Sequence, residues 1–268
     1  MRLDGHIHID QGKPNPAGLL ARMKEGGVDG GILISMWPSR NQSLSFKQRL
    51  DNLMAWTDPA KNLFPFFWVD PLADDAFEEV WAACERGVMG FKVICHDHYP
   101  GHPRAIQVFR AIAREKKPIL FHSGILWDGA PSAKYNRPGE FEAMIDVERA
   151  RFSMAHISWP WYDELVAVYG KFQQMGPGGF SGEMFIDTTP GTPGIYRRDA
   201  LTKVFTVGYN VAGSVFFGSD NGANDYNGRG VRGLIDSDEK ILRGVGLSDA
   251  EIEKYFSENL RRYVGAAK

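Results

Sequence analysis

Two histidines near the start of the chain, His6 and His8 in the segment MRLDGHIHID, have a spacing that could do chemistry. Side chains two positions apart in a strand point to the same face, so both imidazoles could reach one metal ion. A His-x-His pair on its own is better explained as two exposed histidines on an edge strand. The motif therefore predicts a metal site only if further ligand-type residues join it.

Three further residues of ligand type lie at the ends of other strand-like runs. His122 stands in FHSG, His156 in AHIS and Asp220 in FFGSD. If these runs are parallel strands of one barrel, their carboxyl ends meet at one rim, where all five side chains would converge. A structural role explains any one histidine, but not five such residues at equivalent positions. Because Zn²⁺ favours imidazole and carboxylate ligands, we expect a divalent metal, with Zn²⁺ first and Mn²⁺ as the alternative.

Such an ion would make water a usable nucleophile. A divalent metal lowers the pKa of bound water from about 16 to about 7, so hydroxide becomes available at neutral pH. An acidic side chain beside that water can accept its proton and pass it to a leaving group. The five residues thus predict metal-assisted hydrolysis.

Eight short apolar runs are candidates for the strands that would carry these residues. Their starts are separated by about 25 to 35 residues, roughly the length of one strand–helix unit. Several are almost continuous in apolar residues, as strands of a covered parallel sheet are. The candidate strands are 2–9, 30–35, 63–69, 90–95, 118–123, 151–158, 182–188 and 214–220.

Amphipathic segments alternate with these runs and predict helices that pack one face on the sheet. The last one opens with Ser248 and Glu251 at the spacing of a capping box. The alternation predicts a single (β/α)8 TIM barrel over residues 1–268, and no glycine-rich dinucleotide fingerprint follows the first strand to support a Rossmann fold. The clearest helical segments are 45–56, 74–87, 104–117, 161–175 and 248–264.

The composition narrows the class of protein. Of 268 residues, 43% are hydrophobic and 24% charged, with a net charge of −2, so the chain can bury a core and shows no basic character suited to nucleic acid or an anionic membrane. Cys84 and Cys95 are too few for a disulfide framework. We expect a cytoplasmic protein that acts on a small molecule, with no membrane span. Whether identical chains assemble stays open.

The sequence resembles the amidohydrolase superfamily, and within it the amidohydrolase-2 branch, which also holds metal-dependent decarboxylases. The resemblance covers essentially the whole chain and implies a distorted (β/α)8 barrel with one or two divalent metals at its rim. The motifs that carry it are DGHIHID, VDP (69–71), GFKV (90–93), FHSG (121–124), AHIS (155–158), GSD (218–220) and SENLRRY (257–263).

The resemblance also implies roles for individual residues. His6 and His8 would be the metal ligands of the first strand, and His122 that of the fifth. Asp220 would be the ligand of the eighth strand and the proton acceptor. His156 matches the sixth-strand histidine, which binds a second metal or polarises the water or the substrate.

Lys92 in GFKV has three interpretations. In two-metal branches, a lysine on the fourth strand is carbamylated and bridges both ions, which requires a neutral amine. In the branch resembled here, it is an unmodified cation that can hold a substrate carboxylate. A lysine paired inside the barrel is the third interpretation. We expect one metal and an unmodified Lys92, with a second metal left open.

The loops after the strands contain aromatic and arginine side chains that could bind substrate. Trp127 and Tyr135 would supply walls and Arg198 a fork for a carboxylate, which suits a small cyclic or aromatic acid. Most loop arginines are expected instead to be solvated or paired with acids. The other arginines of these loops are Arg40, Arg137, Arg197, Arg229 and Arg232.

A second histidine cluster, CHDHYPGHP, is expected to be a solvated loop without metal ligands, with a contribution to substrate binding or acid catalysis as the alternative. Its Cys95 is expected to be a buried structural thiol.

Three functions remain open from the sequence. The first is metal-dependent hydrolysis of an amide, ester or lactone. The second is nonoxidative decarboxylation of a small aromatic or unsaturated acid. The third is a metal-binding barrel without catalysis.

Overall fold

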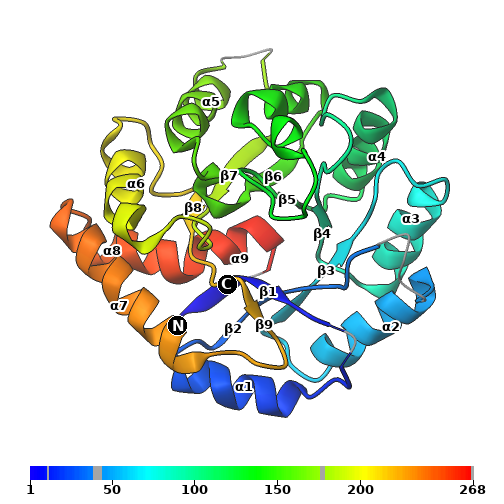
Figure 1. Ribbon diagram of the computed structural model, residues 1–268, viewed down its shortest axis with the longest axis horizontal. Coiled ribbons are helices and arrows are strands. Elements are labelled where there is room, and N and C mark those ends of the chain that lie inside the picture. The colour runs from blue at the N-terminus through cyan, green and yellow to red at the C-terminus, as the bar shows by residue number, and fades with distance from the viewer. Residues whose placement is uncertain (11, 39–43, 176–178, 267–268) are drawn as a thin grey trace.

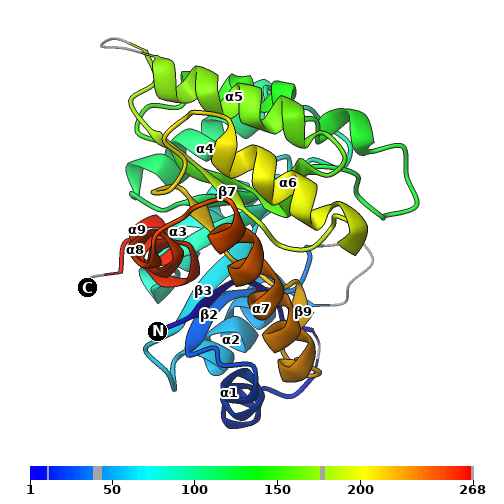
Figure 2. The ribbon, with the colours of Figure 1, turned by 90° about the vertical axis from the view of Figure 1, so that its left-hand side faces the viewer.

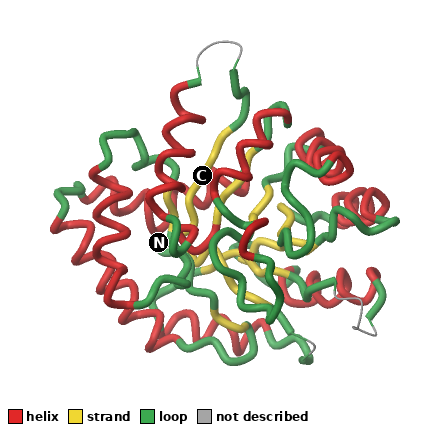
Figure 3. The backbone as a smooth tube through the Cα atoms, turned by 45° about the horizontal axis from the view of Figure 1, so that its top comes forward, coloured by secondary structure: helices red, strands yellow, loops and turns green. Residues whose placement is uncertain are grey.

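Parallel strands form a curved sheet inside a layer of helices in the computed structural model, which describes residues 1–10, 12–38, 44–175 and 179–266 (Figures 1 and 3). The sheet order is β8-β7-β6-β5-β4-β3-β2-β1-β9, and each neighbouring pair is parallel. The strands are β1 (Leu3–His8), β2 (Gly30–Ile34), β3 (Leu63–Trp68), β4 (Gly90–Val93), β5 (Ile119–Phe121), β6 (Arg151–Met154), β7 (Glu183–Asp187), β8 (Val215–Phe216) and β9 (Asn221–Gly222).

The eighth strand differs from the regular strand expected over 214–220. It consists of two short strands, β8 paired with β7 and β9 paired with β1. Residues 215–222 thus supply both end strands of the sheet. The interruption has a physical cause. Asp220 adopts a left-handed backbone conformation, with φ of 60°, and the Asp4 carboxylate accepts a hydrogen bond from the backbone N–H of Ser219. The parallel α/β sheet is as expected, but it has nine strands.

Helices follow most strands and cover the outer face of the sheet. Figure 2 shows α5, α6, α7 and α1 side by side along one side of the molecule. The helices are α1 (Pro16–Glu25), α2 (Phe46–Thr57), α3 (Ala76–Arg86), α4 (Pro103–Arg114), α5 (Tyr162–Gln174), α6 (Gly194–Thr206), α7 (Gly228–Gly244), α8 (Asp249–Glu253) and α9 (Asn259–Val264).

One helical region agrees with the sequence prediction, and another is not α-helical. The capping box of Ser248 and Glu251 is present at the start of α8, as predicted, and a π-helical turn at 254–258 joins α8 to α9. Between β5 and β6 the chain forms 3₁₀ helices, Ala133–Tyr135 and Pro138–Asp146, in place of an α-helix.

Apolar side chains fill both faces of the sheet, since neighbouring residues of a strand point to opposite faces. Leu33 packs outward beneath the helices, whereas Ile32 and Ile34 belong to a second cluster on the inner face. Tyr263 of α9 enters this inner cluster, with its ring centroid 5.1 Å from that of Phe216. Helix α9 therefore covers the amino end of the inner core, and the carboxyl end is left for polar side chains.

Among the described residues, no helix combines the length and the apolar character that crossing a membrane requires.

Candidate metal centre

Three of the predicted ligands converge at the carboxyl ends of the strands. One donor atom from each of His6, His8 and Asp220 lies within 4.8 Å of the others. The two Nε2 atoms of the histidines are 3.1 Å apart. Oδ1 of Asp220 is 3.4 Å from Nε2 of His8 and 3.7 Å from Nε2 of His6.

These separations fit a single divalent ion. A tetrahedral zinc ion with bonds of about 2.0 Å to its ligands separates their donor atoms by about 3.3 Å. The three observed separations, 3.1, 3.4 and 3.7 Å, bracket that value. His6 is fully buried, while His8 and Asp220 are partly exposed, so the cluster is open to substrate on one side.

His122 and His156 lie directly beside this cluster. The His156 ring centroid is 5.3 Å from that of His6 and 4.8 Å from that of His122. Both side chains are at least nine-tenths buried, and the buried atoms Nε2 of His122 and Nδ1 of His156 have no hydrogen-bond partner. Unsatisfied buried nitrogens are costly, and an ion, a water or a substrate atom would satisfy them. A fourth-ligand role for His122 stays a prediction.

The turn that presents His156 is strained. His156, Ile157 and Ser158 all have positive φ, at 61°, 47° and 52°, and none is glycine. The left-handed region is unfavourable for such residues, above all for β-branched isoleucine. Strand β6 ends at Met154, so the strand expected to run to 158 stops short and the chain turns His156 toward the cluster.

Burial favours the neutral, metal-binding form of His6, His122 and His156. It lowers the pKa of His6 and His122 well below the usual 6.5, helped by the charge of Lys92, and it lowers the pKa of His156. Burial alone would raise the pKa of Asp220. The hydrogen bond from His8 is the largest effect that opposes burial, and the pKa lies well below its usual value, so Asp220 is ionised.

Lys92 points at the same cluster from β4. Its Nζ lies 3.4 Å from Nε2 of His6, and the side chain is almost fully buried. Burial lowers the pKa of Lys92 to about 8, against the opposing charges of Asp187 and Asp220. Lys92 therefore lies beside the cluster and lines the cavity, and its binding of substrate stays a prediction.

Asp187 is a residue of the site that the sequence analysis missed. It ends β7, is fully buried, and its Oδ2 lies 2.7 Å from Nδ1 of His6. The signal was present, because Asp187 follows the apolar run MFI and is the last residue but one of the strand predicted over 182–188. It has the same topological place as the chosen ligands.

A cavity of about 340 Å³ opens onto the cluster, and its apolar walls contain four tryptophans. Trp37 and Trp68 are stacked, with centroids 5.5 Å apart and planes 4° from parallel. Trp127, predicted as a wall, is 87% exposed at the mouth. The lining residues are His8, Trp37, Trp68, Lys92, Ile94, His122, Ile125, Leu126, Trp127, Asp128, His156, Trp159, Pro190, Gly191 and Asp220.

The other predicted substrate residues lie outside the described lining of this cavity. Arg198 is exposed on α6, and Tyr135 packs edge-on against Tyr99. Arg137 pairs with Glu164, while Arg197 is buried against Asp238 at 2.5 Å; both match the expectation that loop arginines mostly pair with acids. Arg40 is outside the described residues.

The second histidine cluster differs from the expected solvated loop. His98 is buried, and its Nδ1 lies 3.0 Å from Oδ1 of Asp97. His96 is partly buried, and its ring centroid lies 5.9 Å from that of Trp37 in an edge-on arrangement, so it packs against one residue of the cavity wall. Cys95 is buried and unpaired, as expected, and burial raises the pKa of its thiol.

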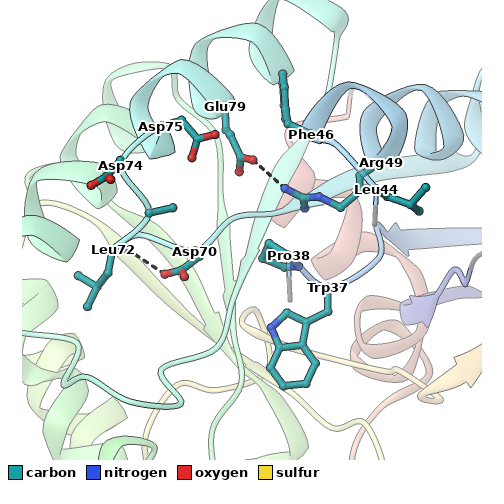
Figure 4. A pocket seen from close by; sticks show the side chains of 11 residues that line it. Trp37, Pro38, Leu44, Phe46, Arg49, Asp70, Leu72, Asp74, Asp75 and Glu79 are labelled. Carbon is teal, nitrogen blue, oxygen red and sulfur yellow. Dashed lines mark hydrogen bonds and ion pairs between the residues drawn. The ribbon is translucent and has the colours of Figure 1, made fainter. Parts of the chain in front are cut away.

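A second cavity, of about 520 Å³, shares Trp37 with the first (Figure 4). Arg49 and Glu79 point toward each other there, with Nη2 of Arg49 2.8 Å from Oε1 of Glu79. Arg49 also donates to the backbone carbonyl of Trp68 at 2.8 Å. The ion pair thus ties α2 and α3 to the end of β3 and holds the tryptophan wall in place.

No protein-family model matches the sequence, and a search of curated proteins finds no match. Solved structures do match in fold. A probable 2-pyrone-4,6-dicarboxylic acid hydrolase from Acinetobacter baumannii, crystallised with citric acid, is 13% identical with a TM-score of 0.63, covering 98% of this chain and 99% of that one. An amidohydrolase 2 from Bifidobacterium longum subsp. infantis is 16% identical with a TM-score of 0.62, covering 99% of both chains.

A third similar structure is the 5-carboxyvanillate decarboxylase of Novosphingobium aromaticivorans with bound manganese. It is 12% identical with a TM-score of 0.66, and the match covers 99% of this chain and 97% of that one. These likenesses show that the chain has the fold of amidohydrolase-superfamily structures, which confirms at the level of fold the resemblance seen in its motifs. The particular chemistry has to be argued from the site.

Proposed function

We propose that this protein is a metal-dependent hydrolase on a distorted (β/α)8 barrel, with one divalent ion, zinc first and manganese second. The single observation that carries the proposal is the convergence of donor atoms from His6, His8 and Asp220 within 4.8 Å, beside a cavity that His8 and Asp220 line. A bound divalent ion would lower the pKa of a water molecule to about 7 and polarise a substrate carbonyl.

The side chains of the site have separate roles. His6, His8 and Asp220 would hold the ion, since their donor atoms converge. The second oxygen of Asp220, Oδ2, accepts the proton of the attacking water, since the lowered pKa keeps the carboxylate ionised. His156 lines the cavity and hydrogen-bonds the water or the substrate carbonyl.

The cavity indicates a small cyclic substrate. Its stacked tryptophans offer a flat apolar surface, and its volume of about 340 Å³ suits a compact ring with a hydrolysable amide, ester or lactone bond. Lys92 is the one lysine or arginine among the described lining residues, so an anionic group of the substrate would pair with it.

Nonoxidative decarboxylation of a small aromatic or unsaturated acid is the second candidate. Lys92 favours it, because a buried ammonium facing an apolar, aromatic cavity can hold a substrate carboxylate. Two of the reactions named for structures of similar fold are also decarboxylations, of 2,6-dihydroxybenzoate and of 5-carboxyvanillate.

One experiment separates the two candidates. The purified protein, loaded with zinc or manganese, is assayed against lactones, aryl esters, cyclic amides and aromatic carboxylates, with acid production and CO₂ release measured in parallel. Acid release without CO₂ supports hydrolysis, and CO₂ from an aromatic acid supports decarboxylation. Turnover that persists at the same rate after complete metal removal would contradict both.

A further inference from the structure

Asp187 is a buried carboxylate whose two oxygens are both engaged. Oδ2 lies 2.7 Å from Nδ1 of His6. Oδ1 accepts from the backbone N–H of Thr189 at 2.8 Å and from its hydroxyl at 2.5 Å. A carboxylate can only accept hydrogen bonds, so Nδ1 of His6 carries the proton and donates it to Asp187.

This contact decides which nitrogen of His6 is free. With its proton on Nδ1, the ring presents the lone pair of Nε2 to the cluster, where Nε2 of His8 lies 3.1 Å away. A histidine that binds metal through Nε2 needs this tautomer, and a carboxylate on the opposite nitrogen also makes the ring a stronger donor. Asp187 therefore acts on His6 through the ring nitrogen opposite to the one that faces the cluster.

The surrounding chain holds Asp187 rigidly. Arg197 donates from Nη1 to the backbone carbonyl of Thr188 at 2.9 Å, and the Thr188 hydroxyl bonds to Tyr255 at 2.7 Å. Thr188, the residue after Asp187, is thus fixed through both its backbone and its side chain, which leaves the neighbouring carboxylate little freedom to turn away from His6.

Asp187 and Thr189 also pack closely against the segment before Asp220. A Cβ placed on Gly218 would overlap the Thr189 hydroxyl and lie 2.9 Å from Oδ1 of Asp187. The absence of a side chain at Gly218 lets the bend before Asp220 lie close to Asp187 and Thr189. Asp187 and Thr189 thus make two contacts with the site. Asp187 binds the imidazole ring of His6, and both residues pack against Gly218, two positions before Asp220.

We propose that Asp187, held by Thr189, is the positioning residue of the metal centre: it fixes His6 in the Nδ1–H tautomer and so sets the affinity of the site for its ion. This inference rests on the proposed function only in requiring that the cluster binds a divalent metal. A buried carboxylate with a purely structural role would leave that affinity unchanged once the chain has folded.

The test compares metal affinity and histidine tautomer in matched variants. Dissociation constants for Zn²⁺ are measured by chelator competition on wild type, Asp187→Ala, Asp187→Asn and Thr189→Val. Removal of a carboxylate partner from a metal-binding histidine typically weakens binding by about 10–100-fold, which is the loss expected for Asp187→Ala. Asp187→Asn keeps an acceptor oxygen without the charge and should show an intermediate loss, and Thr189→Val a smaller one.

Glu79→Gln is the control, because Glu79 is also a buried carboxylate but pairs with Arg49 rather than with a ligand or with the residues that hold Asp187. It should leave zinc affinity within twofold of wild type. Nitrogen NMR of labelled histidine in the metal-free protein should show His6 as the Nδ1–H tautomer in wild type and a mixture of tautomers in Asp187→Ala. If Asp187→Ala does not fold, the other two variants carry the test.

Two outcomes are distinguishable. Wild-type affinity in Asp187→Asn and Thr189→Val, with an unchanged tautomer, overturns the positioning role while leaving the metal centre intact. A wild-type protein that binds no zinc overturns the proposed function itself.

Discussion

Nζ of Lys92 lies 3.4 Å from Nε2 of His6, so a buried amine borders the atom that would bind the metal. A protonated amine there opposes the binding of a cation, whereas a carbamylated one would become a ligand itself. The two states of Lys92 consequently predict opposite effects of removing it.

We expect Lys92→Met to bind one zinc ion per chain at least as tightly as wild type, because the substitution removes a neighbouring positive charge. Turnover should fall, since the substrate loses its cationic partner. Metal analysis after dialysis, chelator competition and intact mass of the wild type provide the measurements. Two ions per wild-type chain, together with the added mass of CO₂ on Lys92, would show that the one-metal assignment is wrong.

Asp220→Asn should separate metal binding from proton transfer. The amide keeps the shape and one ligand oxygen but loses basicity, so we expect turnover to fall by about 100-fold or more. Metal content should fall far less than in His6→Ala/His8→Ala, which removes two of the three converging donors. Near-normal turnover of a metal-loaded Asp220→Asn would transfer the proton-accepting role to His156.

The sequence allowed much of this architecture to be predicted, because its pattern is periodic. Alternating apolar runs and amphipathic segments gave the order of strands and helices, and a residue at the end of a strand is placed by the fold itself. His6, His8 and Asp220 meet for this reason, although Asp220 lies 214 positions after His6 in the sequence.

The remaining features depend on tertiary contacts that leave weak traces in the sequence. The left-handed turn of His156 to Ser158 contains no glycine from which it could have been predicted. The break between β8 and β9 depends on Asp4, a residue 215 positions away from Ser219. Trp68 reads as an ordinary core residue until its stacking on Trp37 shows that it lines the cavity.

Gly218→Ala should destabilise the protein, because the new methyl group would overlap the Thr189 hydroxyl. Forced overpacking of this kind costs about 1–3 kcal/mol of unfolding free energy. Gly233→Ala is the matched control: the site is an exposed position in α7 with open space around the new Cβ, so a gain of about 0.5–1 kcal/mol is expected. Denaturant unfolding of both variants gives the comparison, and equal stabilities would contradict the packing argument.

Glu79 should make stability depend on pH. Burial raises its pKa from 4.5 to about 7 despite the attraction of Arg49. The folded state therefore holds this proton more tightly than the unfolded state does, so the contribution of Glu79 to stability is fully present below pH 4.5 and is lost as pH rises through about 7. The slope for one group is at most about 1.4 kcal/mol per pH unit. Glu79→Gln carries no titrating proton, and the difference in unfolding free energy between it and wild type should change across this window. Parallel curves for the two proteins would refute the assignment.

Trp127 should affect substrate binding without affecting the fold. It is 87% exposed and lines the mouth of the cavity, so Trp127→Ala should change the unfolding free energy by less than about 0.5 kcal/mol. Its apolar surface would contact the substrate in both the ground state and the transition state, which predicts a raised KM with kcat nearly unchanged. Loss of a contact worth about 1.4 kcal/mol corresponds to a tenfold change in KM.

Trp81→Ala is the control, because Trp81 is also exposed, at 54%, but lies on α3 outside the described cavity lining. Steady-state kinetics on the substrate found in the screen should show the rise for Trp127→Ala alone. An equal effect of the two substitutions, or a fall in kcat with KM unchanged, would show that Trp127 does not form part of the binding wall.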